Sequence, residues 1–214
     1  MNSDDSLLAA LCASADSFFA RGLAFGSTGN LSVRLSSGVI AVTPTGLPLQ
    51  GLRPELLARL DPLSGASLTT AKPSKESPFH LGIYRRRPDV NAIVHLHSTY
   101  STALSCREDL DPDQPLPPIT PYYFMRVAPL GIVAYHRPGS AELAAAIEES
   151  AATHNNLLLR NHGLISTGAN WNEAVDRAEE LEETAKLAFL LRGEKLRYLT
   201  ADEIADLDRT FRRA

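Results

Sequence analysis

Two histidines interrupt an apolar run in the segment "NAIVHLHSTY", residues 91–100. The apolar residues around them predict a buried strand, and they are Ala92, Ile93, Val94 and Leu96. Because side chains alternate between the two faces of a strand, His95 and His97 are expected to point to the same side. A single histidine in such a run is most often a core residue, but a pair on one buried face needs a further reason. Neutral imidazole is a common ligand of zinc and of neighbouring transition metals, so the pair is a candidate metal site.

A third histidine stands in a comparable apolar setting. His162, in "RNHGLIST", is predicted to lie in a tight turn between two strands, where Gly163 lets the backbone turn sharply. Three imidazoles are the ligand count of a catalytic zinc that keeps one position open. The other histidines lack such a setting: His80 is interpreted as a helix-face residue, and His136 and His154 as surface residues.

An acidic residue that could serve the same site occurs in "TAKPSKESPFH". Glu76 follows a loop and is predicted to stand at or near the start of a helix that ends before Pro88. Beside a metal it could act as a ligand or a base. The alternative is a first-turn acid that only interacts favourably with the helix dipole. The residues alone leave both interpretations open.

Length and composition limit the class of protein. The chain has 214 residues, 44% hydrophobic and 21% charged, which is typical of a globular domain, and we expect one domain over residues 1–214. A net charge of −4 without a basic stripe argues against a nucleic-acid partner. Two cysteines are too few for a disulfide framework or a thiolate metal site. The acidic start "MNSDDSLLAA" and the lack of any run of membrane-spanning length predict a soluble, cytoplasmic protein without a membrane partner.

The pattern along the chain mixes helices with strands joined by hairpins. Helices are predicted to begin near Ser3, at Pro54, at Glu76, at Gly139, at Asn172 and behind Thr200, where "TADE" matches a capping box. Strands are predicted in "NLSVRL" and "VIAVTPTG", which turn at Gly38, in the histidine segment, in "LGIVAY", in "NLLLRNHG" and in "LISTG". This order predicts an α/β protein with a mixed or antiparallel sheet flanked by helices, and it fits a doubly wound parallel sheet less well.

Five motifs, "GSTGNLSVR", "TPTG", "KPSKE", "HLHS" and "NHG", follow one another in an order and spacing that resemble the class II aldolase/adducin family. The resemblance implies three αβα layers around a central, largely antiparallel sheet. It also implies a homotetramer with active sites at the subunit interfaces. By the same resemblance His95, His97 and His162 bind a divalent metal, most often Zn²⁺. Glu76 is implied as a further ligand in the resting site and as an acid/base once substrate displaces it.

The resemblance also implies a pocket for a substrate phosphate. The matching residues are Gly29, Asn30, Thr45, Gly46 and Ser74. Small residues let backbone N–H groups approach an anion, and hydroxyl and amide side chains complete the cradle. Many aldolases of the family carry a second serine where this chain has Lys75, which would add a positive charge to the phosphate site or reach another anionic group.

Family aldolases place a catalytic tyrosine on the segment that reads "ITPYYFMR" here. Tyr122 or Tyr123 could correspond, and the register favours Tyr122 as a proton donor. The alternative is a pair of aromatic residues that pack against a neighbouring subunit.

Three motifs, "PSKESPFHL", "VHLHST" and "PYYFMR", most resemble one branch of the family. That branch decarboxylates phosphorylated four-carbon 3-oxo sugar acids to dihydroxyacetone phosphate and CO₂, through an enediolate, in sugar-acid catabolism. The alternatives are a class II sugar-phosphate aldolase of the fuculose- or rhamnulose-phosphate type, or a related dehydratase or epimerase. A non-catalytic, adducin-like scaffold is a remote alternative, because the three histidines and Glu76 are all retained.

Overall fold

The centre of the molecule is a seven-stranded sheet in a computed structural model that describes residues 3–211. The strands run in the order β3-β2-β1-β4-β7-β6-β5. Their bounds are β1 Asn30–Arg34, β2 Ile40–Val42, β3 Ala58–Leu60, β4 Ala92–Leu96, β5 Leu130–Val133, β6 Asn156–Leu159 and β7 Gly163–Gly168. β5 pairs with β6 in parallel, and the other five neighbouring pairs are antiparallel. The prediction of a mixed, largely antiparallel sheet is confirmed.

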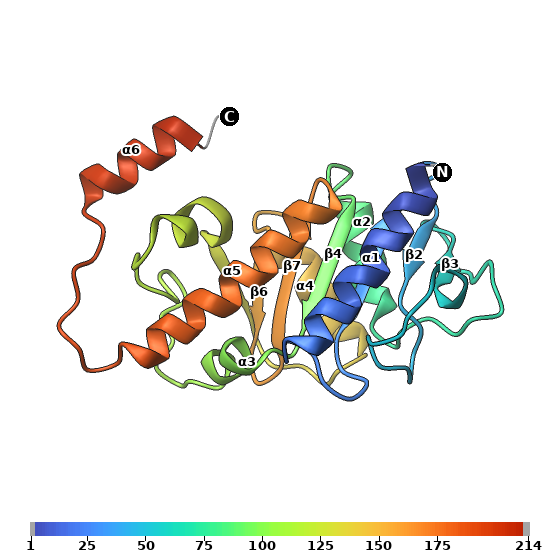
Figure 1. The fold of residues 1–214 in the computed structure, drawn as a ribbon, viewed down its shortest axis with the longest axis horizontal. Helices are drawn as coiled ribbons and strands as arrows, with labels where there is room; N and C mark the ends of the chain where they lie inside the picture. The colour runs from blue at the N-terminus through green and yellow to red at the C-terminus, as the bar shows by residue number, and fades with distance from the viewer. Residues whose placement is uncertain (1–2, 212–214) are drawn as a thin grey trace.

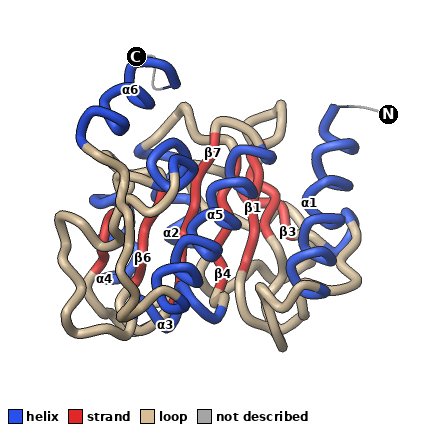
Figure 2. Tube along the Cα trace, turned by 60° about the vertical axis from the view of Figure 1, so that its left-hand side comes forward, coloured by secondary structure: helices blue, strands red, loops and turns tan. Residues whose placement is uncertain are grey.

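Helices cover both faces of this sheet (Figures 1 and 2). One face packs against α1 (Ser3–Ala20), α3 (Thr99–Ser105) and α5 (Trp171–Leu190) through an apolar cluster that includes Leu11, Phe18 and Leu181. The opposite face packs against α2 (Ser77–Arg86) and α4 (Ala141–Ser150) through a second cluster that includes Phe79, Ile83 and Ile147. The predicted three-layer arrangement, with helices on both faces of one sheet, is therefore present.

The alternation of side chains along β1 and β4 decides which polar groups face α2. Leu31 and Val33 of β1 belong to the cluster on the α1 and α5 side. Asn30 and Ser32 therefore point to the α2 side. In β4 the same rule places His95 on the α2 side with Ile93, and Asn30 pairs directly with His95 across the two strands. The sheet thus presents Asn30, Ser32 and His95 together beneath α2.

Most predicted elements are found, and three are additional. The hairpin turns at Gly38, whose φ is 85°, and Thr200 and Glu203 exchange the two hydrogen bonds of a capping box at the start of α6 (Ala201–Phe211). The helix at Pro54 is a single 3₁₀ turn, η1 (Pro54–Leu56). Strand β3, helix α3 and the π-helical turn η2 (Tyr123–Val127) were not predicted.

Helix α6 stands off from the sheet in both views, and none of its residues is buried (Figures 1 and 2). Among the described residues no helix combines the length and apolar character that crossing a membrane requires.

Gly163 at the start of β7 lies against β4 more closely than any side chain would allow. A Cβ atom at this position would lie 2.3 Å from the carbonyl oxygen of Leu96. We expect Gly163→Ala to lower the free energy of unfolding by roughly 1–3 kcal/mol, because the two central strands must move apart. Urea denaturation measures the change. Gly82→Ala in α2 is the matched control, because the three atoms nearest to its Cβ all belong to the Glu148 side chain, and the closest is Oε2 at the end of that side chain, at 2.7 Å. Equal stability of the two variants would contradict the prediction.

Candidate metal centre and active site

Four side chains of the types that bind metals, from three separate parts of the chain, converge where the central strand β4 ends and β7 begins. Glu76, His95, His97 and His162 each offer an atom within 4.8 Å of the others. His95 lies in β4, His97 immediately follows it, His162 precedes β7, and Glu76 is the residue before α2. The antiparallel pairing of β4 with β7 brings His162 next to the other two histidines.

The ring nitrogens and the carboxylate face one another. His95 Nε2 lies 3.0 Å from His97 Nε2 and 3.3 Å from Glu76 Oε2, and His162 Nε2 lies 3.4 Å from Glu76 Oε1. His95 Nδ1 donates a hydrogen bond of 2.7 Å to the carbonyl oxygen of Leu164. That bond fixes the tautomer in which Nε2 keeps its lone pair toward the cluster.

The protonation states suit a cation. Burial lowers the pKa of His97 to about 3 and that of His162 to about 4, with a further contribution from the neighbouring His95, so both rings are neutral near pH 7. Burial alone would raise the pKa of Glu76. Contacts with His95, with His162 and with the Asn30 amide more than offset this effect and hold the pKa well below its usual range. Glu76 is therefore ionised.

Two buried atoms of the cluster have no hydrogen-bond partner within the described chain, namely Glu76 Oε1 and His162 Nδ1. Glu76 is the N-cap residue of α2, but its side chain makes no capping bond and points to the histidines instead. A buried carboxylate oxygen that no N–H or O–H group satisfies is costly unless a cation compensates it. Three imidazoles and one carboxylate are a donor set that fits a divalent cation such as zinc.

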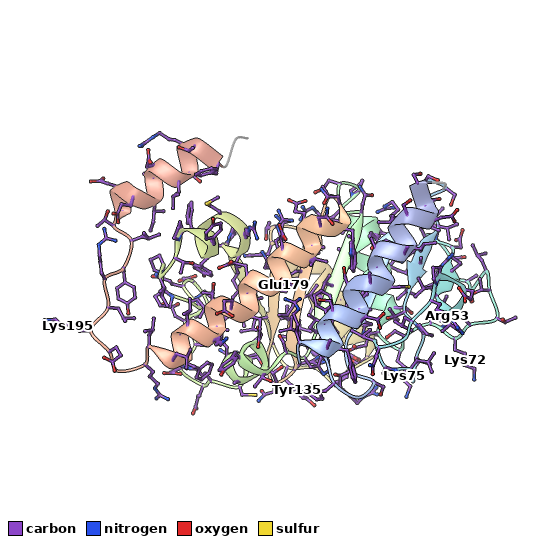
Figure 3. All side chains as sticks on the ribbon, viewed as in Figure 1. Arg53, Lys72, Lys75, Tyr135, Glu179 and Lys195 are labelled. Atoms are coloured by element: carbon purple, nitrogen blue, oxygen red, sulfur yellow. The ribbon has the colours of Figure 1, made fainter. Side chains whose placement is uncertain are left out.

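The cluster forms one wall of a cavity of about 620 Å³. Nine of the predicted site residues line it: Gly29, Asn30, Thr45, Gly46, Ser74, Lys75, Glu76 and two of the histidines, His97 and His162. The side chain of His95 is fully buried behind them. Figure 3 labels the exposed Lys75 at the lower right of the molecule. The structure thus brings the predicted metal ligands and the predicted phosphate loops into one cavity.

The loops around the cavity are tied to the sheet by short hydrogen bonds. Ser74 donates its backbone N–H to Thr43 at 3.1 Å, and its hydroxyl oxygen accepts the N–H of Glu76 at 3.2 Å. Gly29 has a φ of 79°, and a Cβ atom there would lie 3.0 Å from the carbonyl oxygen of His95. The loop can therefore pass close to β4 only with glycine at this position.

The side chain of Asn30 is occupied at both ends. Its Nδ2 donates to Glu76 Oε2 at 2.8 Å, and its Oδ1 lies 2.6 Å from His80 Nε2. One amide hydrogen remains for a ligand in the cavity.

The tyrosine pair lies outside the cavity of its own chain. Tyr122 is 53% exposed and stacks beneath the guanidinium of Arg126, whose Cζ is 5.5 Å from the ring centroid. Arg126 also forms an ion pair of 3.4 Å with Asp176 of α5. Tyr123 is buried in the apolar cluster on the α5 side. Neither tyrosine is among the residues that line the cavity.

Several lining residues were not predicted from the sequence. Ser27 and Thr28 place hydroxyl groups at the wall before Gly29, and Asn161 lies beside His162 with a φ of 56°. A signal was present in the quoted motifs "GSTGN" and "RNHG", where small polar residues flank the assigned positions. Pro138 and Gly139 also line the cavity, and they come from the segment before α4, which no motif marks.

Comparison with known proteins agrees with this arrangement. The model of the family described as class II aldolase and adducin N-terminal domain matches residues 9–189. The chain belongs to this family. A "3-oxo-tetronate 4-phosphate decarboxylase" of Haemophilus influenzae is 50% identical to this class II aldolase and adducin family protein over 192 residues, which is 90% of this chain and 91% of the relative. An "L-fuculose phosphate aldolase" of Methanococcus maripaludis is 37% identical over 79% of this chain and 89% of the relative.

Solved structures of the family have the same fold. The crystal structure of YgbL from Escherichia coli matches this family member with a TM-score of 0.92 and 46% identity, covering 95% of this chain and 98% of YgbL. An L-fuculose 1-phosphate aldolase matches with a TM-score of 0.85 and 26% identity, covering 100% of this chain and 98% of the aldolase. The predicted class II aldolase-like fold is confirmed.

Proposed function

We propose that this protein is a metal-dependent carboxy-lyase that converts a 3-oxo-tetronate 4-phosphate to dihydroxyacetone phosphate and CO₂. The observation that supports it most directly is the single cavity in which the histidine and glutamate cluster faces loops of small residues. The substrate class is that of similar proteins named as decarboxylases, such as the 50% identical relative from Haemophilus influenzae. Four-carbon sugar-acid catabolism is the corresponding physiological role.

The phosphate would dock in the loops at the cavity mouth. The proposed contacts are the backbone N–H groups and small polar side chains of Gly29, Asn30, Thr45, Gly46 and Ser74. Lys75 is the cationic side chain among the described lining residues, and it would add charge to this end of the cavity. Phosphate binding there would orient the oxo and carboxylate carbons toward the cluster.

The reacting end would lie at the cluster. His95, His97, His162 and Glu76 are the proposed ligands of a divalent ion, with zinc as the proposed metal. Such an ion, when bound, supplies Lewis-acid stabilisation of the oxygen next to the developing carbanion. The C1–C2 bond breaks, CO₂ leaves, and the electron pair of that bond stays on C2 next to the C3 ketone as an enediolate. One proton added at C2 then gives dihydroxyacetone phosphate.

Two groups are proposed to deliver that proton. Glu76 is ionised in the resting site, so it can relay a proton only after accepting one. Tyr122 is the other proposed donor, and it would have to act from a neighbouring subunit, because it does not line the cavity of its own chain. This requirement supports a homo-oligomer, for which we propose a homotetramer. We further propose that residues 1–214 form one domain that acts in the cytoplasm. Residues 1, 2 and 212–214 lie outside the described residues.

Aldol cleavage is the competing activity, because it passes through the same type of enediolate and releases an aldehyde in place of CO₂. Purified, Zn²⁺-loaded protein is to be given 3-oxo-tetronate 4-phosphates of each configuration and, separately, ketose 1-phosphates. We expect stoichiometric CO₂ and dihydroxyacetone phosphate from one of the keto acids. Efficient aldehyde release with no CO₂ would reject the decarboxylase and favour the aldolase.

Lys75 provides a specific prediction for the phosphate end. Lys75→Ser would restore the pair of hydroxyl groups found in many family aldolases. We expect kcat/KM for the phosphorylated keto acid to fall. The corresponding loss of transition-state stabilisation is roughly 1–3 kcal/mol, the cost of leaving an anion without its charged partner. Steady-state kinetics measures the change. Lys72→Ser is the matched control, because Lys72 is exposed near Lys75 in Figure 3 but does not line the cavity. An equal loss in both variants would indicate general electrostatics in place of a contact.

A further inference from the structure

A row of buried polar side chains leads from the cluster into the interior between α2 and β1. Glu76, His80 and Tyr84 recur every fourth residue, so they lie on one face at the start and along the length of α2. Asn30 and Ser32 are two apart on β1, on the face that α2 covers. The helical and strand spacings interleave the two sets into a single row.

The row is joined by consecutive hydrogen bonds. Tyr84 Oη lies 2.9 Å from Ser32 Oγ, and Ser32 Oγ lies 2.7 Å from His80 Nδ1. His80 Nε2 lies 2.6 Å from Asn30 Oδ1, and Asn30 Nδ2 lies 2.8 Å from Glu76 Oε2. Asn30, Ser32, His80 and Tyr84 are each no more than 4% exposed. The polar atoms of this row therefore depend on one another for their hydrogen bonds.

The chemistry of the groups allows one direction of donation. The Asn30 amide turns its Nδ2 N–H group toward Glu76 Oε2, so its carbonyl oxygen Oδ1 faces His80. His80 must then donate from Nε2. Burial lowers the pKa of His80 to about 3, so the ring is neutral and its Nδ1 is an acceptor. The Ser32 hydroxyl donates to Nδ1, and the Tyr84 hydroxyl donates to Ser32.

We propose that His80, held by Ser32 and Tyr84, is a positioning residue that fixes the Asn30 amide and thereby the orientation of the Glu76 carboxylate in the cluster. The inference rests on the proposed function in one respect, that Glu76 is a metal ligand and a proton carrier. Without His80 the Asn30 amide can rotate and present its carbonyl oxygen to a carboxylate, which repels it. Glu76 then loses the donor that holds Oε2 in place.

The test measures metal affinity and kinetics separately. His80→Phe keeps a ring of similar size and removes both nitrogens. The Kd of the metal-free protein for Co²⁺, from a spectrophotometric titration, is expected to rise by about 10–100-fold, the usual effect of removing a group that orients a ligand. With the phosphorylated keto acid we expect kcat to fall by a larger factor than KM rises, because Asn30 is the one proposed phosphate contact that His80 touches. Ser32→Ala and Tyr84→Phe should raise the Kd progressively less, in the order of their distance from Glu76.

A spectroscopic readout tests the direction of the bonds without any activity. ¹⁵N NMR of histidine-labelled, metal-free protein should show His80 as the Nε2–H tautomer, with Nδ1 as an acceptor. The signals of His80 are assigned as those that disappear from the spectrum of the His80→Phe variant. A His80 ring protonated on Nδ1 would overturn the proposed row, because Ser32 would then accept and Asn30 would have no donor.

Ile83→Val is the control for a purely structural effect. Ile83 is fully buried in α2 and belongs to the apolar cluster on that face, so its truncation loosens the helix without touching the row. It should leave the Kd for Co²⁺ unchanged. A folded His80→Phe variant with the Kd of the unmodified protein would overturn the proposal. If His80→Phe does not fold, Ser32→Ala decides, and an unchanged Kd in that variant overturns it equally. If the unmodified protein binds Co²⁺ but releases no CO₂, the proposed function fails, and the affinity series still tests His80.

Discussion

His97→Ala is expected to abolish turnover while the chain still folds. The His97 ring projects into the cavity, and its Nε2 lies 3.0 Å from that of His95, so its removal takes away one of the converging ligand atoms. The two apolar clusters that stabilise the fold do not include it. Metal analysis after dialysis should show far less than the bound Zn²⁺ of the unmodified protein, and circular dichroism should be unchanged.

The control for this prediction is another histidine outside the cluster. His154→Ala removes a partly buried ring that bonds to Thr153 and to the backbone of Ser150. It should keep both metal and activity. Full metal content and normal turnover in His97→Ala would show that the three-histidine assignment is wrong.

Glu76→Gln should lower turnover by at least about 10²-fold, because an amide of the same shape has no basic oxygen to accept a proton. Substrate binding should be largely kept, because a glutamine oxygen can still accept the hydrogen bond from Asn30, and the Ser74 hydroxyl bonds to the backbone N–H of residue 76, which the substitution keeps. Steady-state kinetics with saturating metal separates the two quantities, since KM should change little while kcat falls.

Glu148→Gln is a matched control for this substitution, since Glu148 lies on α4, half exposed, in a 3.8 Å pair with Arg85. It should have normal kinetics. A normal kcat in Glu76→Gln would instead mean that Glu76 serves only as a ligand or as a first-turn acid.

The central strands and the three histidines of the cluster were readable from the sequence because their signals are local. Two histidines in an apolar run already specify one face of a strand, and His162 lies in a turn as predicted. The turn covers residues 160–162 and uses Asn161 with a φ of 56°, whereas Gly163 is the first residue of β7. The strand spacing therefore contained most of the cluster. Glu76 could be assigned a role only through the family resemblance, because a first-turn acid looks the same in sequence.

The elements that the sequence did not predict depend on distant partners. Helix α3 has only 7 residues, and its start is held by Glu182 of α5, which accepts the N–H groups of Tyr100 and Ser101 at 2.9 and 2.8 Å. No sequence pattern near residue 99 predicts that a carboxylate from another helix will accept these N–H groups. Strand β3 has 3 residues, too few to show a period.

His80 illustrates a second limit. It was interpreted as a helix-face residue, and it does lie on a face of α2, but that face is fully buried against β1. The spacing of four residues between Glu76, His80 and Tyr84 was visible in the sequence. Its meaning appears only once Asn30 and Ser32 are placed opposite, which depends on how α2 packs on the sheet.

The pairing of β4 with β7 also bears on how the chain folds. This pairing joins Ala92 to Gly168 and Leu96 to Leu164, so the cluster closes only when segments nearly 70 residues apart in the sequence meet. Contacts of such long sequence separation form slowly, because the loop between them must be ordered first. Fragments that end before His162 lack one of the four side chains and cannot assemble the ligand set. A metal that binds this set would therefore stabilise the strand pairing with the largest separation in sequence. Metal binding would then report that this pairing has formed.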